Sequence, residues 1–225
     1  MTLLQGFGDQ IIAGAITTLQ VALTSLVLGI AVGLCGAMAK VSGIGALRWL
    51  ADGYTTIVRG IPELLIILIL YFGGTVALTA LFGRYVEVDA FAAGVFALTI
   101  VFGAYATEVF RAALLAVPRS QIEAAHALAL SRALTFRLVI LPQMWRYALP
   151  GLGNLWLTLL KDTALISVVG LEDLMRKASV AAGATHDPLT FYLVAAALYL
   201  TFTSVSLVGL ALLEQRAGRG VRISE

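Results

Sequence analysis

Charged side chains inside long apolar runs are the residues of this sequence with the clearest capacity for chemistry. Lys161 and Asp162 interrupt the apolar run 147–171, and Glu108 interrupts the run 90–117. Because mid-membrane insertion of an ionised residue costs roughly 2.5–3.5 kcal/mol, such side chains normally face a helix-bundle interior or a water-filled cavity. They predict a polar path within a membrane protein. The other residues that could line this path are Glu63, Tyr105, Asn154, Thr158 and Thr163.

Several of these charges also have a structural interpretation. Arg59 and Glu63 are four residues apart, and Glu108 and Arg111 are three apart. At those spacings two side chains share one face of a helix and can form an ion pair. We favour the structural interpretation for Arg59 and Arg111, and we leave both interpretations open for Glu108.

The adjacent pair Lys161 and Asp162 allows similar alternatives. Consecutive residues of a helix point about 100° apart, so the two side chains need not neutralise each other. Lys161 either reaches a partner helix as a structural contact or meets a substrate carboxylate in the path. A cationic group of a substrate would suit Asp162 or Glu108.

The composition is that of an integral membrane protein. Of the 225 residues, 60% are hydrophobic and 12% are charged, whereas soluble domains carry about 25% charged residues. The mean hydropathy is +0.95. We therefore expect an all-α integral membrane fold in a single domain, residues 1–225, with five helices long enough to cross a hydrocarbon core of about 30 Å. The predicted spans are residues 11–39, 54–82, 90–117, 147–171 and 189–213.

Two details of the packing can be predicted as well. Gly29, Gly33 and Gly36 lie in the second half of the first span. Small residues at such spacing allow helices to approach closely, so we expect tight packing there. The mixed polar segment 172–187 is expected to hold a short surface helix.

The sequence offers no catalytic, metal or cofactor site. No phosphate loop of the form GxxxxGK[ST] occurs in it. His126 and His186 lie in loops without ligand partners at metal spacing, and the single cysteine, Cys35, cannot form an intramolecular disulfide. If the protein uses ATP, another subunit must bind the nucleotide and its magnesium.

The distribution of basic residues predicts the orientation in the membrane. Five spans place the two termini on opposite sides, and the side that holds the first loop, the loop 118–142 and the C-terminal tail carries ten of the fifteen Lys and Arg residues. The positive-inside rule makes this side cytoplasmic and places the N-terminus outside, in the periplasm. The ten residues are Lys40, Arg48, Arg111, Arg119, Arg132, Arg137, Arg146, Arg216, Arg219 and Arg222.

The loop 118–142, between the third and fourth spans, is itself predicted to be helical. Ser120 is a favourable N-cap residue and Glu123 follows three residues later, which is the pattern of a capping box. We expect a helix from Ser120 to about Leu130. Its alanines combine high helix propensity with little bulk, so that another surface can approach closely. They are Ala124, Ala125, Ala127 and Ala129.

A second amphipathic turn follows in the same loop. It carries Arg132 and Arg137, and Pro142 is expected to end it. The spacing of the whole loop resembles the EAA loop of ABC importer permeases, which reads Glu-Ala-Ala, three residues, a glycine, nine residues, then Ile-x-Leu-Pro. The matching residues here are Glu123, Ala124, Ala125, Ala129 at the glycine position, Val139 at the isoleucine position, and Leu141 with Pro142.

Three longer stretches extend the resemblance over nearly the whole chain. They are similar to permeases of the polar amino acid uptake family, above all to the Q-type permeases of the histidine and lysine–arginine–ornithine importers, with the octopine and nopaline importers near them. The chain departs from the family pattern at Asp162, where a small hydroxyl residue is expected after the lysine. The stretches read YTTIVRGIPELL, FGAYATEVFRAALLAVPRSQIEAA and LPGLGNLWLTLLKDTALISVVGLEDL.

This resemblance implies a type I ABC importer permease in the bacterial inner membrane. It implies a homologous M-type partner permease, two ATPase subunits and a periplasmic amino acid-binding protein. The helix at Glu123 would be the coupling helix, with Glu123 facing the ATPase and the small residues permitting close docking. The transported substrates would be basic amino acids or opines, and the chain itself would not be an enzyme.

A second hypothesis is an ion- or proton-coupled secondary transporter. Lys161, Asp162 and Glu108 would then relay ions or protons. This hypothesis has less support, because inverted repeats are not visible in the sequence and the capped loop would remain unexplained.

Overall fold

The computed structural model describes residues 4–218, and every regular element within them is a helix. Five helical segments are long and apolar enough to cross a membrane, which confirms the predicted all-α class with five spans. In chain order these segments are α1 (Gly8–Val41), α3 with η1 and α4 (Glu63–Phe82), α5 (Ala90–Leu115), α7 with η2, α8 and η3 (Arg132–Val169), and α10 (Pro188–Gly218).

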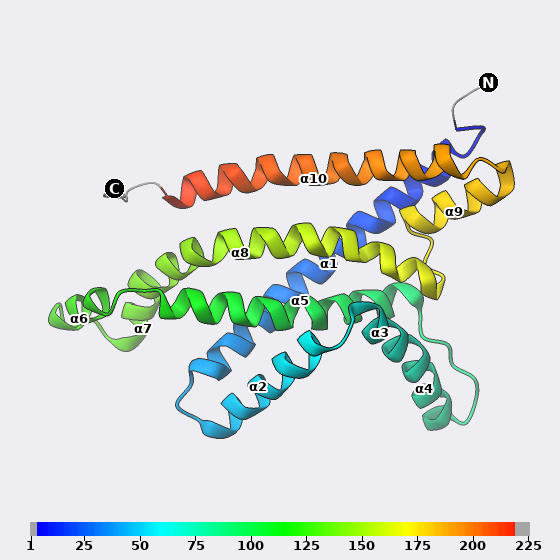
Figure 1. Cartoon of the computed structure of the whole chain (residues 1–225). Helices are drawn as coiled ribbons and strands as arrows, with labels where there is room; N and C mark the ends of the chain where they lie inside the picture. Colours follow the sequence, from blue (N-terminus) through cyan, green and yellow to red (C-terminus); the bar gives the residue numbers. More distant parts are fainter. Residues whose placement is uncertain (1–3, 219–225) are drawn as a thin grey trace.

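Three shorter helices connect the spans. They are α2 (Gly45–Gly60), α6 (Arg119–Ala127) and α9 (Leu174–Thr185). Figure 1 shows α6, α7, the α1–α2 connection and the C-terminal end of α10 at one end of the bundle, and α9 with the N-terminus at the other. The loops with many basic residues therefore lie together at one end; Arg219 and Arg222 fall outside the described residues.

The pair of α1 and α5 is the most extensive helix contact, and it depends on small residues. A Cβ atom added to Gly33 would lie 2.6 Å from the Cβ of Ala106, and one added to Gly36 would overlap the side chain of Thr107. The close approach predicted from the spacing of Gly29, Gly33 and Gly36 is thus confirmed. Helix α5 is the most buried span, with 67% of its most hydrophobic window buried, and forms the centre of the bundle.

The second span starts later than the predicted range 54–82. Helix α2 ends at Gly60, Ile61 and Pro62 are extended, and α3 begins at Glu63. A residue before proline is pushed out of the helical region by the proline ring, which explains the break. Arg59 and Glu63 therefore lie on two different helices, so the prediction that they share one helical face is wrong.

The fourth span is longer than the predicted range 147–171 because Pro142 does not end a helix. The chain is helical from Arg132, passes through the π-helical segment η2 (Phe136–Ile140), and continues into α8 (Leu141–Asp162). A wide π turn accommodates a residue that lacks an N–H donor. Helix α8 then gives way to the 3₁₀ segment η3 (Thr163–Val169). Lys161 and Asp162 lie in the last turn of α8, and η3 continues the same span to Val169.

Helix α9 is anchored by a buried aspartate. Asp173 is fully buried and its side chain accepts a hydrogen bond from the backbone N–H of Arg176, which caps the helix. The backbone N–H of Leu174 donates to the hydroxyl of Thr18 on α1. Burial raises the pKa of Asp173 to about 6. The predicted helix within 172–187 is present, but it packs on α1 and α10 rather than lying free on the surface.

Substitution of Gly33 by alanine is expected to destabilise the chain. The new methyl group would meet Ala106 and its backbone, which cannot move aside as a flexible side chain can. Overpacking of this kind costs about 1–3 kcal/mol. Thermal melting of the purified chain in detergent measures the effect.

The matched control is Gly209→Ala on α10, where an added Cβ meets no atom of the described chain within 4 Å. Alanine favours the helix over glycine by up to about 1 kcal/mol, so Gly209→Ala should melt at the same temperature as the wild type or higher. If Gly33→Ala behaves like Gly209→Ala, the close α1–α5 approach is not a constraint on stability.

Candidate functional site

A cavity of about 230 Å³ lies between α3, α5 and α8, and we call it the carboxylate cavity. It collects four of the eight residues predicted for the polar path: Glu63, Tyr105, Thr158 and Asp162. Its remaining walls are apolar. They are formed by Leu98, Val101, Phe102, Leu155 and Leu159.

The two acidic side chains reach the carboxylate cavity from opposite helix ends. Glu63 is the first residue of α3, directly after the break at Pro62, and Asp162 is the last residue of α8. No ion pair engages either carboxylate among residues 4–218. A cavity with two unpaired carboxylates and otherwise apolar walls attracts a ligand with positive charge.

A second, more open cavity of about 550 Å³ adjoins the first, and we call it the α2 cavity. Tyr105 lines both cavities. The guanidinium carbon of Arg59 lies 5.2 Å from the centre of the Tyr105 ring, in cation–π contact. The other lining residues of the α2 cavity are Lys40, Asp52, Thr55, Thr56, Gly60 and Glu108.

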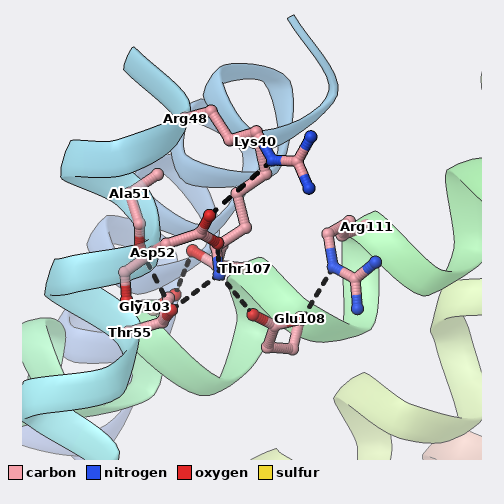
Figure 2. A network of polar contacts seen from close by, with 9 residues as sticks. All are labelled: Lys40, Arg48, Ala51, Asp52, Thr55, Gly103, Thr107, Glu108 and Arg111. Atoms are coloured by element: carbon pink, nitrogen blue, oxygen red, sulfur yellow. Dashed lines mark hydrogen bonds and ion pairs between the residues drawn. The ribbon is translucent and has the colours of Figure 1, made fainter. Parts of the chain in front are cut away.

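The carboxylate groups of the α2 cavity, unlike those of the first, are already paired (Figure 2). The ammonium group of Lys40 lies 2.6 Å from Oε1 of Glu108 and 2.7 Å from Oδ1 of Asp52, and it donates a 2.7 Å hydrogen bond to the hydroxyl of Thr55. Nε of Arg111 lies 2.8 Å from the other oxygen of Glu108. We call these five residues the lysine cluster.

The lysine cluster joins three helices at a buried point. Lys40 comes from the last turn of α1, Asp52 and Thr55 from α2, and Glu108 from α5. The Lys40 side chain is only 6% exposed, and that of Glu108 is 22% exposed. Removal of one partner from a buried, hydrogen-bonded charge pair leaves the other charge uncompensated. The cluster therefore fixes α2 against α1 and α5.

Four of the predicted path residues do not line the carboxylate cavity. Glu108 belongs to the lysine cluster, and its predicted pair with Arg111 is present. Thr163 is buried, and its hydroxyl donates to the carbonyl of Leu160. Asn154 and Lys161 are exposed on α8, and no ion pair engages Lys161 among the described residues.

Sequence reasoning missed the lysine cluster. Lys40 was counted only as a loop charge, and Asp52 and Thr55 were not considered. A signal was available, because Asp52, Thr55 and Arg59 recur at intervals of three and four residues and thus share one face of α2. That face points toward α5, while apolar residues such as Leu50 and Ile57 are exposed on the other side.

The helix of the loop 118–142 begins and ends at other residues than predicted. Helix α6 starts at Arg119, so Ser120 lies inside its first turn and no side chain caps it. The predicted capping box with Glu123 is therefore wrong, because the extended backbone of Pro118 starts the helix one residue earlier. Ala125 is 3% exposed and packs within the chain, whereas Glu123 and Ala124 are exposed.

Ala129 lies beyond the end of α6 rather than within it. Its φ angle is +57°, in the left-handed region. The N–H of Leu130 donates to the carbonyl of Ala125, and the N–H of Ala129 donates to that of His126. This is a Schellman motif, in which glycine is the preferred left-handed residue. The conformation at Ala129 gives a backbone reason for the glycine that the resembling loops carry at this position.

Comparison with known proteins gives a consistent result over almost the whole chain. The family model described as binding-protein-dependent transport system inner membrane component matches residues 25–219. The nopaline transport system permease protein NocQ of Agrobacterium fabrum is 49% identical, over 99% of this chain and 98% of that protein. The histidine/lysine/arginine/ornithine transport system permease protein HisQ of Salmonella typhimurium is 42% identical, over 98% of each chain.

Solved structures have the same architecture. A crystal structure of an amino acid ABC transporter with histidines superposes with a TM-score of 0.82 at 36% identity, over 92% of this chain and 94% of that chain. An inward-facing structure of the MetNI methionine ABC transporter superposes with a TM-score of 0.79. Its identity is 19%, over 96% of this chain and 99% of that chain, so it supports the fold alone.

Substitution of Lys40 by methionine is expected to destabilise the chain by about 3 kcal/mol, because it leaves the partly buried Glu108 without its closest cation. The double variant Lys40→Met with Glu108→Gln should recover part of this loss, since a neutral amide needs no counter-charge. The free energy of unfolding in a detergent–denaturant titration measures both effects.

Lys177→Met is the matched control, because the partner of Lys177, Glu172, has a side chain that is 74% exposed. This control should change stability little. A double variant as unstable as Lys40→Met alone would show that the uncompensated carboxylate is not the cause.

Proposed function

The chain belongs to the family of binding-protein-dependent transport system inner membrane components, and we propose that it carries basic amino acids or opines across the membrane as the translocation subunit of an ATP-driven importer. The carboxylate cavity is the observation that supports this substrate class most directly. Its two acidic residues, Glu63 and Asp162, have no cation of the described chain paired with them. The names of the nopaline and histidine/lysine/arginine/ornithine relatives agree with a cationic substrate.

The cavity can hold a cationic group through charge and hydrogen bonds together. In a site with apolar walls, two carboxylates attract a positive group more strongly than they would in water. The hydroxyl groups of Tyr105 and Thr158 add donor and acceptor capacity at the same cavity. Asp162, which stands where a small hydroxyl residue was expected, supplies the second negative charge.

A homologous M-type permease is the partner that we propose for the exposed polar face of α8. Asn154, Thr158 and Lys161 recur at intervals of four and three residues, so they lie on one side of the helix. All three are exposed in the single chain. A carboxylate of the partner permease would neutralise Lys161, which explains how an exposed lysine can lie within a span.

The exposed side of α6 is the surface that we propose for the ATPase. Glu123, Ala124 and Leu128 are exposed there, and Leu128 is 75% exposed. Arg132 and Arg137 are exposed on the following turn. A cytoplasmic ATPase would push on this helix, and the continuous helix from α7 to α8 would carry the displacement to Asp162. A periplasmic binding protein would deliver substrate at the opposite end, beside the N-terminus and α9.

This arrangement gives the ion-coupled transporter less support than the importer. Glu108, one of the three relay residues of that hypothesis, is held between Lys40 and Arg111 and is not available to bind and release ions. Lys161 and Asp162 face different surroundings, one exposed and one in the cavity.

Asp162→Asn and Glu63→Gln should each lower ATP-driven lysine uptake by about tenfold or more, because each removes one charge-assisted contact to the substrate. Uptake is measured per assembled complex in proteoliposomes with binding protein in excess. Glu214→Gln, an exposed carboxylate of α10 outside the cavity, is the matched control and should transport normally. Unchanged uptake in both cavity variants would contradict the proposed substrate site.

Ala124→Trp should leave the permease folded and abolish most substrate-stimulated ATP hydrolysis, because an indole on the exposed side of α6 holds the ATPase away. Ala77→Trp is the matched control, since Ala77 is an exposed alanine of α4, outside the surfaces proposed for the ATPase and the binding protein. Normal stimulated hydrolysis in the Ala124→Trp complex would rule out α6 as the ATPase contact, and with it the proposed orientation.

A further inference from the structure

The two adjoining cavities are lined by six charged residues of both signs, and three of these charges already have partners. In the α2 cavity, Asp52 and Glu108 both form ion pairs with Lys40 inside the lysine cluster. Lys40 makes three polar contacts, to Asp52, Thr55 and Glu108, and an ammonium group has three N–H donors. The lysine therefore has no donor left for a ligand.

Arg59 differs from Lys40 in this respect. Within residues 4–218, no ion pair and no hydrogen bond engages its guanidinium group. Its one specific contact is the cation–π contact with the ring of Tyr105. Among the described residues that line either cavity, Arg59 is thus the cation whose donors remain open to a ligand; Lys161 lines neither cavity.

The contact with Tyr105 orients Arg59 without consuming its hydrogen-bonding capacity. A guanidinium group over an aromatic face keeps its N–H donors at the edge of its plane, where they match the two oxygens of a carboxylate. Tyr105 is also the residue that the two cavities share. Arg59 therefore lies beside the residue that lines both the α2 cavity and the cavity with the two carboxylates.

We infer that Arg59 binds the α-carboxylate of the transported amino acid while Glu63 and Asp162 bind its cationic groups. This inference rests on the proposed function. A basic amino acid carries two cationic groups and one carboxylate, and the cavities offer two unpaired carboxylates and one unpaired guanidinium. The break at Ile61 and Pro62 places Arg59 and Glu63 on separate helices beside adjoining cavities, so that one substrate can contact both.

Three probes of nearly the same size separate the contributions of the two charges. They are lysine, cadaverine (lysine without its carboxylate) and norleucine (lysine without its side-chain charge). Equilibrium binding of each radiolabelled probe is measured on the complete permease–ATPase complex in nanodiscs without binding protein. The wild type should bind lysine about tenfold or more tightly than either of the other probes, as expected for one charge-assisted contact.

Arg59→Gln should reduce lysine affinity to the level of cadaverine and leave cadaverine unchanged. Arg59→Lys should retain part of the preference for lysine, because it keeps the positive charge but loses the paired N–H donors that bind both oxygens of a carboxylate. The matched control is Arg48→Gln, an arginine of the same helix whose side chain is 69% exposed and lies outside both cavities. It should bind all three probes as the wild type does.

Two results would overturn the inference about Arg59. One is an Arg59→Gln complex that still prefers lysine over cadaverine. The other is an equal loss of affinity for lysine and cadaverine, which would indicate a structural role. The proposed function fails in a different way, namely if the wild type binds norleucine as tightly as lysine. Melting temperature and co-purification with the ATPase verify assembly of each variant. If Arg59→Gln does not assemble, Arg59→Lys tests the inference instead, and an undiminished preference for lysine over cadaverine in that variant would contradict it.

Discussion

The contact of the Lys40 ammonium group with three acceptors is the constraint on which the arrangement of the cavities depends. It ties the end of α1 to Asp52 and Thr55 of α2 and to Glu108 of α5. The other contacts that hold α2 are few: Ala51 and Thr55 are its buried residues, and the hydroxyl of Tyr54 donates to the carbonyl of Ile100 on α5. The position of Arg59, one turn beyond Thr55, follows from the same contact. Lys40, which has no donor left for a ligand, thereby positions Arg59, which we infer to bind the substrate carboxylate.

Pairing separates the charges of the two cavities into structural and functional sets. Asp52 and Glu108 are neutralised by fixed cations, and their polar atoms are satisfied. Glu63 and Asp162 have no such cations and lie among apolar side chains. An uncompensated charge in such surroundings is costly, and a cationic ligand removes that cost on binding. Ion pairs within the chain thus fix the positions of the helices, and the unpaired charges remain available to bind a ligand.

Hydropathy predicted the five spans well because burial in lipid depends on composition over about 20 residues. Local backbone events were harder to predict. Proline ends a helix at Pro62, but the expectation that Pro142 also ends one was wrong, because a wide π turn accommodates a residue without an N–H donor. Asp162 was placed on the path from its charge alone. Lys40 was missed, because its partners lie 12 to 68 residues away in the sequence.

The π-helical segment η2 also determines the rotational phase of α8. A π turn holds one residue more than an α turn. If η2 were a regular α-helix, the extra residue would add one more step of about 100°, and all later residues would be rotated by that angle about the helix axis. Lys161 would then occupy the angular position that Asp162 holds now. The geometry of five residues at the start of the span, Phe136–Ile140, thus decides whether the far end presents a negative or a positive charge to the cavity.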